Sequence, residues 1–375
     1  MVRNKGARFA TLVAAGALAF GALAACGSSD SGGSSSSSDG GSSAAATGKV
    51  GVILPDSKSS VRWETQDRPN LEAAFKAAGL ESDIQNAEGS PDTFGQLCDQ
   101  MITEGVNVLI ETDLDPDSGK ACIDKAKNAG IAVIDYDRLT LGGGADYYVS
   151  FDNVKVGALM GTGLQQCLGD KAQGAGVVYI NGDPTDNNAA LFKEGYDTQL
   201  KQDGKVSILS SDVSGFWDAT KAGKAFDGLY TQFGNKIQGV ISANDTMAGG
   251  IVASLKRNGL AGKVPVTGQD ASVEGLQRIL AGTQCMTVYK NTNLEADAAS
   301  KLAIAVANGD KAGAAALATA KVKDTVTGKD VPSALATPEA IFADTVKKVV
   351  SDGYQKASDV CTAEFAAACT KYGVS

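Results

Sequence analysis

The sequence predicts two α/β domains, each built around a parallel β-sheet, on three grounds. From residue 49 onward, short apolar runs typical of buried strands alternate with segments whose apolar residues recur at helical spacing. The alternation starts again after Asp152 and Asn153, without a residue-level repeat. The chain of 375 residues is also longer than one hydrophobic core of usual size requires. Because strands separated by helices of this length pair through right-handed crossovers, both sheets should be mainly parallel.

The same pattern places the elements of both domains. In the first, a helix carries Leu71 and Phe75 on one face, has Pro69 in its first turn and stops at Gly79. A second helix opens at Pro91. The expected strands are 50–54, 82–85, 106–110 and 131–136 in the first half, and 177–180, 206–209, 240–242, 264–267 and 286–289 in the second.

The beginning of the chain has the features of a secretory signal. Arg3, Lys5 and Arg8 precede an apolar stretch over 9–25, which is shorter than the roughly 20 residues of a membrane-spanning helix. The stretch ends Leu-Ala-Ala-Cys, which resembles the lipobox of bacterial lipoproteins, where the cysteine, here Cys26, is lipidated. We therefore expect a lipoprotein signal peptide at 1–25 and a Ser/Gly-rich tether at 26–48. A plain signal peptide followed by a chance cysteine is the alternative.

Composition narrows the classes of function. The chain has no histidine, which excludes Ser-His-Asp and Cys-His nucleophile systems and HExxH zinc sites. With 43 acidic and 34 basic residues it should repel phosphate backbones, so nucleic acid is not an expected partner. Neither GxGxxG nor a Walker loop is present. We expect no cofactor and no metal, and the high content of Ala and Gly favours a GC-rich, Gram-positive source.

Six cysteines follow Cys26, and sequence alone allows fifteen ways of pairing them. Disulfides suit an exported protein. In the expected topology, the helices that carry Cys98 and Cys122 lie on one face of the first sheet, so these two could form a bridge. Cys361 could pair with Cys369 near the end of the chain. Cys167 with Cys285 is then left by elimination.

Polar and aromatic residues collect where the predicted strands end, which is where open parallel sheets bind ligands. Carboxylates, amides and guanidinium groups can bridge vicinal hydroxyls, and indole rings can cover apolar C–H faces, so the set suits a hydroxyl-rich ring. Each residue also has a plain structural explanation, because Asp or Asn after a strand often caps the next helix and a tryptophan can be a core residue. The set includes Arg62, Trp63, Asp137, Arg138, Asp186, Asn188, Trp217, Asn244, Gln269, Asp270 and Lys290.

Several stretches resemble the type I periplasmic-binding-protein sugar receptors of bacterial ABC importers, especially the D-xylose-binding proteins. The resemblance covers the body from Lys49 to about Cys361. It implies two Rossmann-like lobes joined by three crossings near Asp152, Tyr289 and Leu335. The implied N-terminal lobe is 49–152 plus 290–335, and the C-terminal lobe is 153–289 plus 336–375. The matching stretches are Arg62-Trp63, Asp67-Arg68, Tyr136-Asp137-Arg138, Ser150-Phe151-Asp152-Asn153, Asp186-Asn187-Asn188, Asn244-Asp245, Gly268-Gln269-Asp270, the run 283–290, Val331-Pro332-Ser333 and the run 354–358.

The resemblance also implies a function. A monosaccharide, D-xylose first, would bind between the lobes and be delivered to the permease and ATPase of an importer. The protein would be a monomer and would meet the membrane only through its lipid anchor, on the outer face of the cell. The stretch 58–60 and the C-terminal tail also resemble multiple-sugar receptors, which take glucose, galactose and arabinose and can have a sensory role. The residues implied to bind sugar are Arg62, Trp63, Asp137, Arg138, Asp186, Asn188, Trp217, Asn244, Asp270 and Lys290.

Two further classes of function were weighed against this one. A glycosidase could use Asp137 and Asp186 as its carboxylate pair, but Arg138 beside Asp137 favours an ionised acceptor over a general acid. A LacI-type regulator would share the lobes, but it needs an N-terminal DNA-binding helix pair where this chain has a lipobox and a tether. A binding protein is therefore the prediction.

Overall fold

The structure of the chain is a computed structural model that describes residues 48–375. The expected signal peptide, Cys26 and the tether as far as residue 47 lie outside the described residues. No helix within 48–375 combines the length and the apolar character that crossing a membrane requires.

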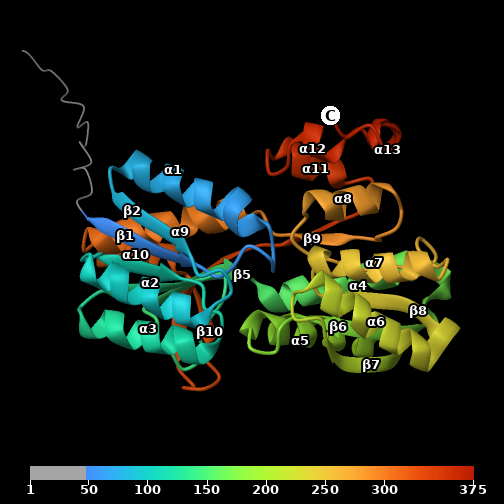
Figure 1. The fold of residues 1–375 in the computed structure, drawn as a ribbon, viewed down its shortest axis with the longest axis horizontal. Coiled ribbons are helices and arrows are strands. Elements are labelled where there is room, and N and C mark those ends of the chain that lie inside the picture. The colour runs from blue at the N-terminus through green and yellow to red at the C-terminus, as the bar shows by residue number, and fades with distance from the viewer. Residues whose placement is uncertain (1–47) are drawn as a thin grey trace, which may run out of the picture. The chain divides into compact units, whose positions relative to one another are not determined.

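A seven-stranded sheet forms the centre of what we call the first lobe (Figure 1). All neighbouring strands in it are parallel except the pair β10–β11, which is antiparallel. The strands, in their order across the sheet, are β10 (Ala320–Lys323), β11 (Asp330–Ala336), β5 (Tyr147–Phe151), β4 (Ala132–Tyr136), β3 (Val108–Glu111), β1 (Lys49–Leu54) and β2 (Glu81–Asn86).

Helices cover both faces of this sheet because its strands are apolar on both sides. Val52 and Leu54 of β1 pack in one core with α1 (Arg68–Ala78) and α9 (Thr292–Ala307). Ile53 of the same strand points the other way, into a core with α2 (Pro91–Thr103) and α3 (Pro116–Asn128). The short helix α10 (Lys311–Leu317) packs on α9 and β11. The predicted helix signals hold here, since Pro69 lies in the first turn of α1 and Gly79, at φ 76°, ends it.

The second lobe contains a three-stranded parallel sheet in the order β7-β6-β8 and an antiparallel pair β12–β9. The prediction of a strand at 264–267 is wrong, because this segment forms only one isolated β-bridge, between Val266 and Val240. Pro265 has no backbone N–H to donate, which shortens the ladder there. The strands are β6 (Gly176–Asn181), β7 (Ser207–Ser214), β8 (Ile237–Ser242), β9 (Thr287–Tyr289) and β12 (Glu339–Ile341). The helices are α4 (Asn153–Leu168), α5 (Asn187–Asp203), α6 (Ala219–Phe233), α7 (Asp245–Arg257), α8 (Val273–Leu280), α11 (Val346–Ser351), α12 (Ala357–Val360) and α13 (Ala366–Tyr372).

The chain passes between the lobes three times. It leaves β5 at Asp152 for α4, returns from β9 through Lys290 to α9, and leaves β11 again for β12. The first and third passages lie side by side, because the Asp152 amide donates to the Ala336 carbonyl at 3.1 Å. The predicted fold of two lobes on a three-crossing hinge is thus confirmed. The exact lobe boundaries stay a prediction.

Three disulfides connect the six cysteines of residues 48–375, and they are the three pairs considered from the sequence. Cys98–Cys122 joins α2 to α3, Cys167–Cys285 joins α4 to the segment before β9, and Cys361–Cys369 closes a loop in the C-terminal tail. Each bridge therefore lies within one lobe or the tail packed on it, and none of the three spans the gap between lobes.

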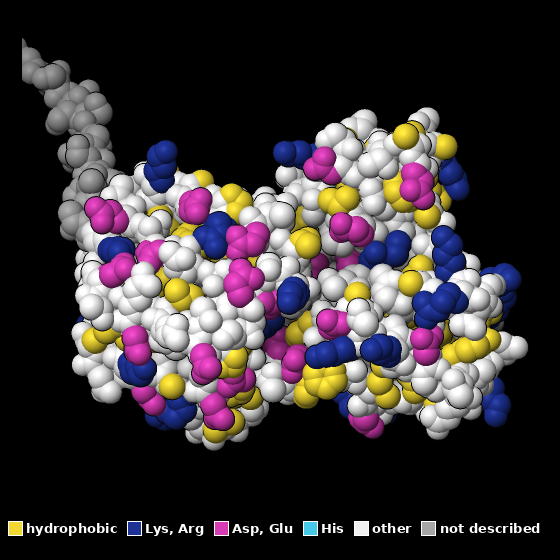
Figure 2. All heavy atoms as spheres, in the orientation of Figure 1, with side chains coloured by type: hydrophobic (Ala, Val, Ile, Leu, Met, Phe, Trp, Pro, Cys, Tyr) yellow, Lys and Arg dark blue, Asp and Glu magenta, His cyan; other side chains and the backbone are white. Residues whose placement is uncertain are grey.

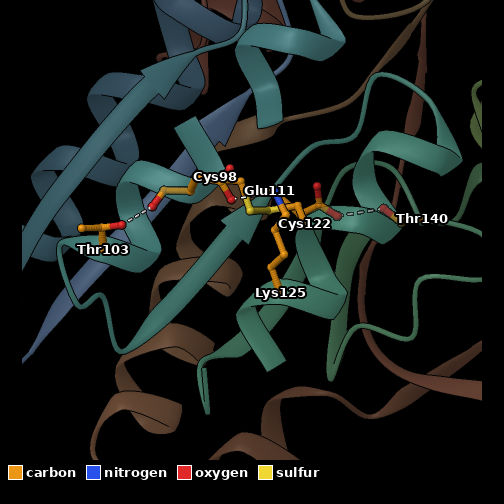
Figure 3. The surroundings of a disulfide bond; sticks show 7 residues. Cys98, Thr103, Glu111, Cys122, Lys125 and Thr140 are labelled. Carbon is orange, nitrogen blue, oxygen red and sulfur yellow. Dashed lines mark hydrogen bonds and ion pairs between the residues drawn. A yellow bond between two sulfur atoms is a disulfide. The ribbon is translucent and has the colours of Figure 1, made fainter. Parts of the chain in front are cut away.

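Glu111 lies next to the first disulfide (Figure 3), and it forms a pair of buried carboxyl groups with Asp135, its register partner in the sheet. Glu111 at the end of β3 and Asp135 in β4 are both fully buried. Thr140 donates its hydroxyl to Glu111 at 2.9 Å and its backbone N–H to Asp135 at 2.9 Å. Glu111 Oε2 and Asp135 Oδ1 have no partner among the described residues. Two buried acids without a cation beside them are most stable when they hold a proton.

Charge is distributed unevenly between the lobes. Residues 49–152 and 290–335 together contain 24 acidic and 15 basic side chains, whereas residues 153–289 and 336–375 together contain 17 acidic and 16 basic ones. On the face drawn in Figure 2, acidic side chains are frequent over the first lobe, and lysines and arginines are prominent over the second.

Candidate ligand-binding site

A small cavity of about 30 Å³ lies between the lobes, at the carboxyl ends of the strands. All ten predicted sugar-binding side chains line it: Arg62, Trp63, Asp137, Arg138, Asp186, Asn188, Trp217, Asn244, Asp270 and Lys290. Four residues outside that predicted set line it too, namely Ser59, Ser60, Phe192 and Gln269. The structure brings the predicted residues together, while their contact with a ligand stays a prediction.

Arg62 is the charged centre of the first lobe's wall. It precedes a single π-helical turn, Trp63–Asp67, that runs into α1, and such turns often occur at functional sites. Its guanidinium group, only 3% exposed, forms two hydrogen bonds to Asp67 at 2.8 and 2.7 Å. It also donates to Asp137 at 2.7 Å and to Glu295 at 2.6 Å. Four bonds to three carboxylates fix the position of this side chain before any ligand arrives.

Asp137 directly follows β4 and is bound from several directions. One carboxylate oxygen accepts from Arg62 at 2.7 Å and from Lys290 at 3.0 Å, and the other accepts from Asn188 at 3.0 Å. Burial alone would raise the pKa of Asp137, but the charges of Lys290, Arg62 and Arg138 outweigh burial and hold that pKa well below its ordinary value. A carboxylate that stays ionised accepts hydrogen bonds from hydroxyls and cannot act as a general acid.

Asp186 and Asn244 are helix caps and cavity residues at once. Asp186 Oδ1 accepts from the Asn188 amide at 2.8 Å at the start of α5, and Asn244 Oδ1 accepts from the Met247 amide at 2.9 Å at the start of α7. Their remaining polar atoms face the cleft, where Asp186 Oδ2 accepts from Trp217 Nε1 at 3.2 Å. The capping explanation is therefore confirmed for both residues, while their role in sugar binding stays a prediction.

The two tryptophans lie on opposite walls. The Arg62 guanidinium stacks over the Trp63 ring at 4.3 Å from its centroid. Trp217 packs edge-on against Phe192 with centroids 6.3 Å apart. Gly182 makes room for Trp217, since a Cβ there would lie 2.0 Å from the indole Cζ2 atom. Both rings are more than nine-tenths buried and still line the cavity.

The backbone is in the left-handed region at several points of the site. Among residues 48–375, non-glycine residues with positive φ are Glu88, Asp137, Phe216, Trp217, Asp270 and Ala271. Three of the six line the cavity: Asp137 at 62°, Trp217 at 55° and Asp270 at 98°. Such conformations cost about 1–3 kcal/mol each and concentrate at ligand-binding sites, where packing enforces them.

Polar groups of the two lobes meet directly across the cleft. Arg138 Nε lies 3.0 Å from Asp186 Oδ2, and Ser60 donates to Asp270 at 3.1 Å. Asn244 Nδ2 donates to the Ser59 carbonyl at 3.1 Å. These contacts define a closed arrangement in which both lobes contribute to one polar site. Among residues 48–375, no group of three or more Cys, Asp or Glu side chains is arranged to hold a metal ion.

Gln269 and Phe192 are the informative omissions from the predicted set. Gln269 is 5% exposed, and its Oε1 atom has no hydrogen-bond partner among the described residues. It belongs to the strand-end set named from the sequence, beside Asp270, but not to the ten residues implied to bind sugar. Phe192 lies inside α5, where the sequence signals only a core residue.

Fold and site define a two-lobed binding protein, and comparison with known proteins agrees. Residues 50–311 match the family model described as "Periplasmic binding protein domain". The D-xylose-binding periplasmic protein of Escherichia coli (strain K12) is 34% identical over 318 residues, covering 83% of this chain and 92% of that protein. The multiple sugar-binding periplasmic receptor of Rhizobium radiobacter is 34% identical over 338 residues, covering 84% and 92%.

Solved structures give the same answer. A carbohydrate transporter solute-binding protein from Chloroflexus aurantiacus, in complex with D-glucose, superposes with a TM-score of 0.73 at 28% identity, covering 84% of this chain and 98% of that one. An ABC transporter solute-binding protein from Clostridium phytofermentans with bound β-D-glucose gives 0.74 at 29% identity, covering 83% and 99%. The chain belongs to the periplasmic binding protein family. These relatives are binding proteins of transport systems and not enzymes, which argues against the glycosidase alternative.

Proposed function

We propose that this protein is the substrate-binding lipoprotein of an ABC sugar importer and that it holds one monosaccharide, D-xylose, between its lobes. The observation that supports this most is the cavity between the lobes, which all ten polar and aromatic side chains named above line together. The ligand would bridge the lobes, and the closed form would be what the permease and its ATPase recognise.

The wall chemistry supports a neutral, hydroxyl-rich ligand. Asp137 and Asp270 offer charged acceptors, while Arg62, Lys290 and Asn188 offer donors. Carboxylates on both walls would repel a phosphorylated sugar. The D-xylose-binding relatives favour a pentose.

A multiple-sugar receptor with a sensory role is the second candidate. The multiple sugar-binding receptor of Rhizobium radiobacter is as similar to this chain as the D-xylose-binding protein of Escherichia coli, at 34% identity. Under this alternative, D-glucose, D-galactose and L-arabinose would bind in the same cavity with comparable affinity.

The lobe boundaries and the cellular location of the protein belong to the same proposal. We assign 49–152 with 290–335 to the N-terminal lobe and 153–289 with 336–375 to the C-terminal lobe. The signal at 1–25, lipidation of Cys26 and the tether at 26–48 would place a monomer on the outer face of a Gram-positive membrane. The relatives are periplasmic proteins, which supports a location outside the cytoplasm.

Calorimetric titration of residues 48–375 against D-xylose, D-glucose, D-galactose and L-arabinose tests the function. We expect one site per chain, tightest binding of D-xylose, and no effect of EDTA. Equal affinity for several of the sugars would select the multiple-sugar receptor. If none of the four sugars binds or raises the melting temperature, while an amino acid does, the proposal fails.

A further inference from the structure

Asp245 is a buried acid outside the cavity whose carboxylate contacts a ligand-binding loop. It is the first residue of α7 and is 1% exposed. Its Oδ2 atom accepts from the Ser272 amide at 2.9 Å and from the Ser272 hydroxyl at 3.2 Å. Its Oδ1 atom accepts from Gln284 Nε2 at 2.7 Å. An acid that only favoured the start of a helix would need none of these partners.

The loop 268–272 and the first turn of α8 are closely fitted around this carboxylate. A Cβ on Gly268 would lie 2.1 Å from Asp245 Oδ1, and a Cβ on Gly275 would lie 2.2 Å from Oδ2. The Asp245 amide also donates to the Gln269 carbonyl at 3.0 Å. The loop is thus held on both sides of Asp270, which has a φ of 98°.

Two neighbours keep the carboxylate oriented. Arg278 donates to the Asp245 carbonyl at 2.6 Å and to Gln284 Oε1 at 2.9 Å. The amide of Gln284 is therefore oriented by Arg278, so that its nitrogen faces Asp245. The chain of contacts runs from Arg278 through Gln284 and Asp245 to the loop that carries Asp270.

We propose that Asp245 is a positioning residue: its carboxylate, oriented by Gln284, holds the loop 268–272 so that Asp270 faces the cavity. Asp245 itself does not line that cavity. This inference rests on the proposed function, because it concerns the placement of a residue proposed to bind sugar.

Asp245→Asn tests the inference, because it places an amide nitrogen opposite either Ser272 or Gln284, both of which are donors. We expect sugar affinity, measured by calorimetry with D-xylose, to fall by about 5- to 50-fold. Glu274→Gln, at an exposed acid in the first turn of α8, is the control and should bind within twofold of wild type.

A double-mutant cycle with Asp270→Asn separates positioning from general destabilisation. If Asp245 acts through Asp270, Asp245→Asn should lower sugar affinity by less than about twofold in a protein that already carries Asp270→Asn. Should Asp245→Asn not fold, Gln284→Met enters the same cycle, with a smaller loss of affinity expected. Unchanged affinity or additive losses would overturn the inference, whereas failure of the wild-type protein to bind any of the four sugars would overturn the proposed function instead.

Discussion

Replacing Asp270 with asparagine removes one charged acceptor of the second lobe with little change in shape. The residue is 6% exposed, and its Oδ2 atom accepts from Ser60 at 3.1 Å. Asparagine suits the site better than alanine, because Asn tolerates positive φ and this residue has a φ of 98°. The substitution therefore changes the charge and one acceptor oxygen while the backbone can stay in place.

The size of the effect follows from what the carboxylate would contact. Hydrogen bonds to charged groups contribute about 1.5–3 kcal/mol, compared with about 0.5–1.5 kcal/mol for neutral pairs. Loss of the charge should therefore weaken sugar binding by about 1–2 kcal/mol, or about 5- to 30-fold in Kd. Burial raises the pKa of Asp270, against the opposing charges of Lys290 and Arg62, so the measurement is made at pH 8 to favour the ionised form.

Calorimetric titration with the tightest-binding sugar of the panel measures this change. Circular dichroism and the melting temperature should show that the variant is folded. Asp212→Asn, at a carboxylate that is 82% exposed in the same lobe, is the matched control and should leave Kd within twofold of wild type. If folded Asp270→Asn also binds within twofold, the assignment of Asp270 as a sugar acceptor is refuted.

Three further predictions concern the stacking face, the buried acid pair and the anchor. Trp217→Ala should weaken sugar binding by about 1–3 kcal/mol through lost apolar contact, measured by calorimetry; an unchanged Kd would remove Trp217 from the site. Burial raises the pKa of Asp135 to about 7 and that of Glu111 well above its ordinary value, so the folded protein retains protons that the unfolded chain releases. The free energy of unfolding should therefore fall as pH rises through 7, and Glu111→Gln should lessen that fall in urea titrations between pH 5.5 and 9; identical slopes for both proteins would contradict this reasoning. Cys26→Ala should move the protein from the membrane fraction to the medium or leave an uncleaved precursor, and an unchanged membrane fraction would argue against lipidation.

Strand ends made most of the site predictable from sequence. Asp137, Asp186 and Asn244 each follow a strand that hydrophobic runs reveal, and the carboxyl ends of parallel strands meet at one edge. That reasoning needs no knowledge of side-chain geometry, so it placed residues from distant parts of the chain in one cavity. It treated capping and cleft lining as alternatives for Asp186 and Asn244, whereas the structure shows that different atoms of one side chain can do both.

Other features lacked a local signal. Phe192 lines the cavity from inside a helix, where periodicity marks it only as apolar. The short strands β10 and β12 have four and three residues, too few for a clear alternation. The sequence showed Asp245 only as the residue next to Asn244 in a matching stretch. Its hydrogen bonds to Ser272 and Gln284 depend on tertiary structure.

The disulfides pair cysteines in the order in which they occur along residues 48–375: first with second, third with fourth, fifth with sixth. If the chain is exported as proposed, its N-terminal part emerges from the translocation channel first. The second cysteine of each pair can then form a disulfide with the first, which is still unpaired when the second emerges. The native pairing would form in this way without disulfide exchange. The sequence separation is 24 residues for Cys98–Cys122 and 8 residues for Cys361–Cys369. It is 118 residues for Cys167–Cys285, so Cys167 stays unpaired until a much longer segment has emerged. Biogenesis of the second lobe, and not of the first, is therefore the step at which an unpaired thiol stays exposed longest to incorrect oxidation.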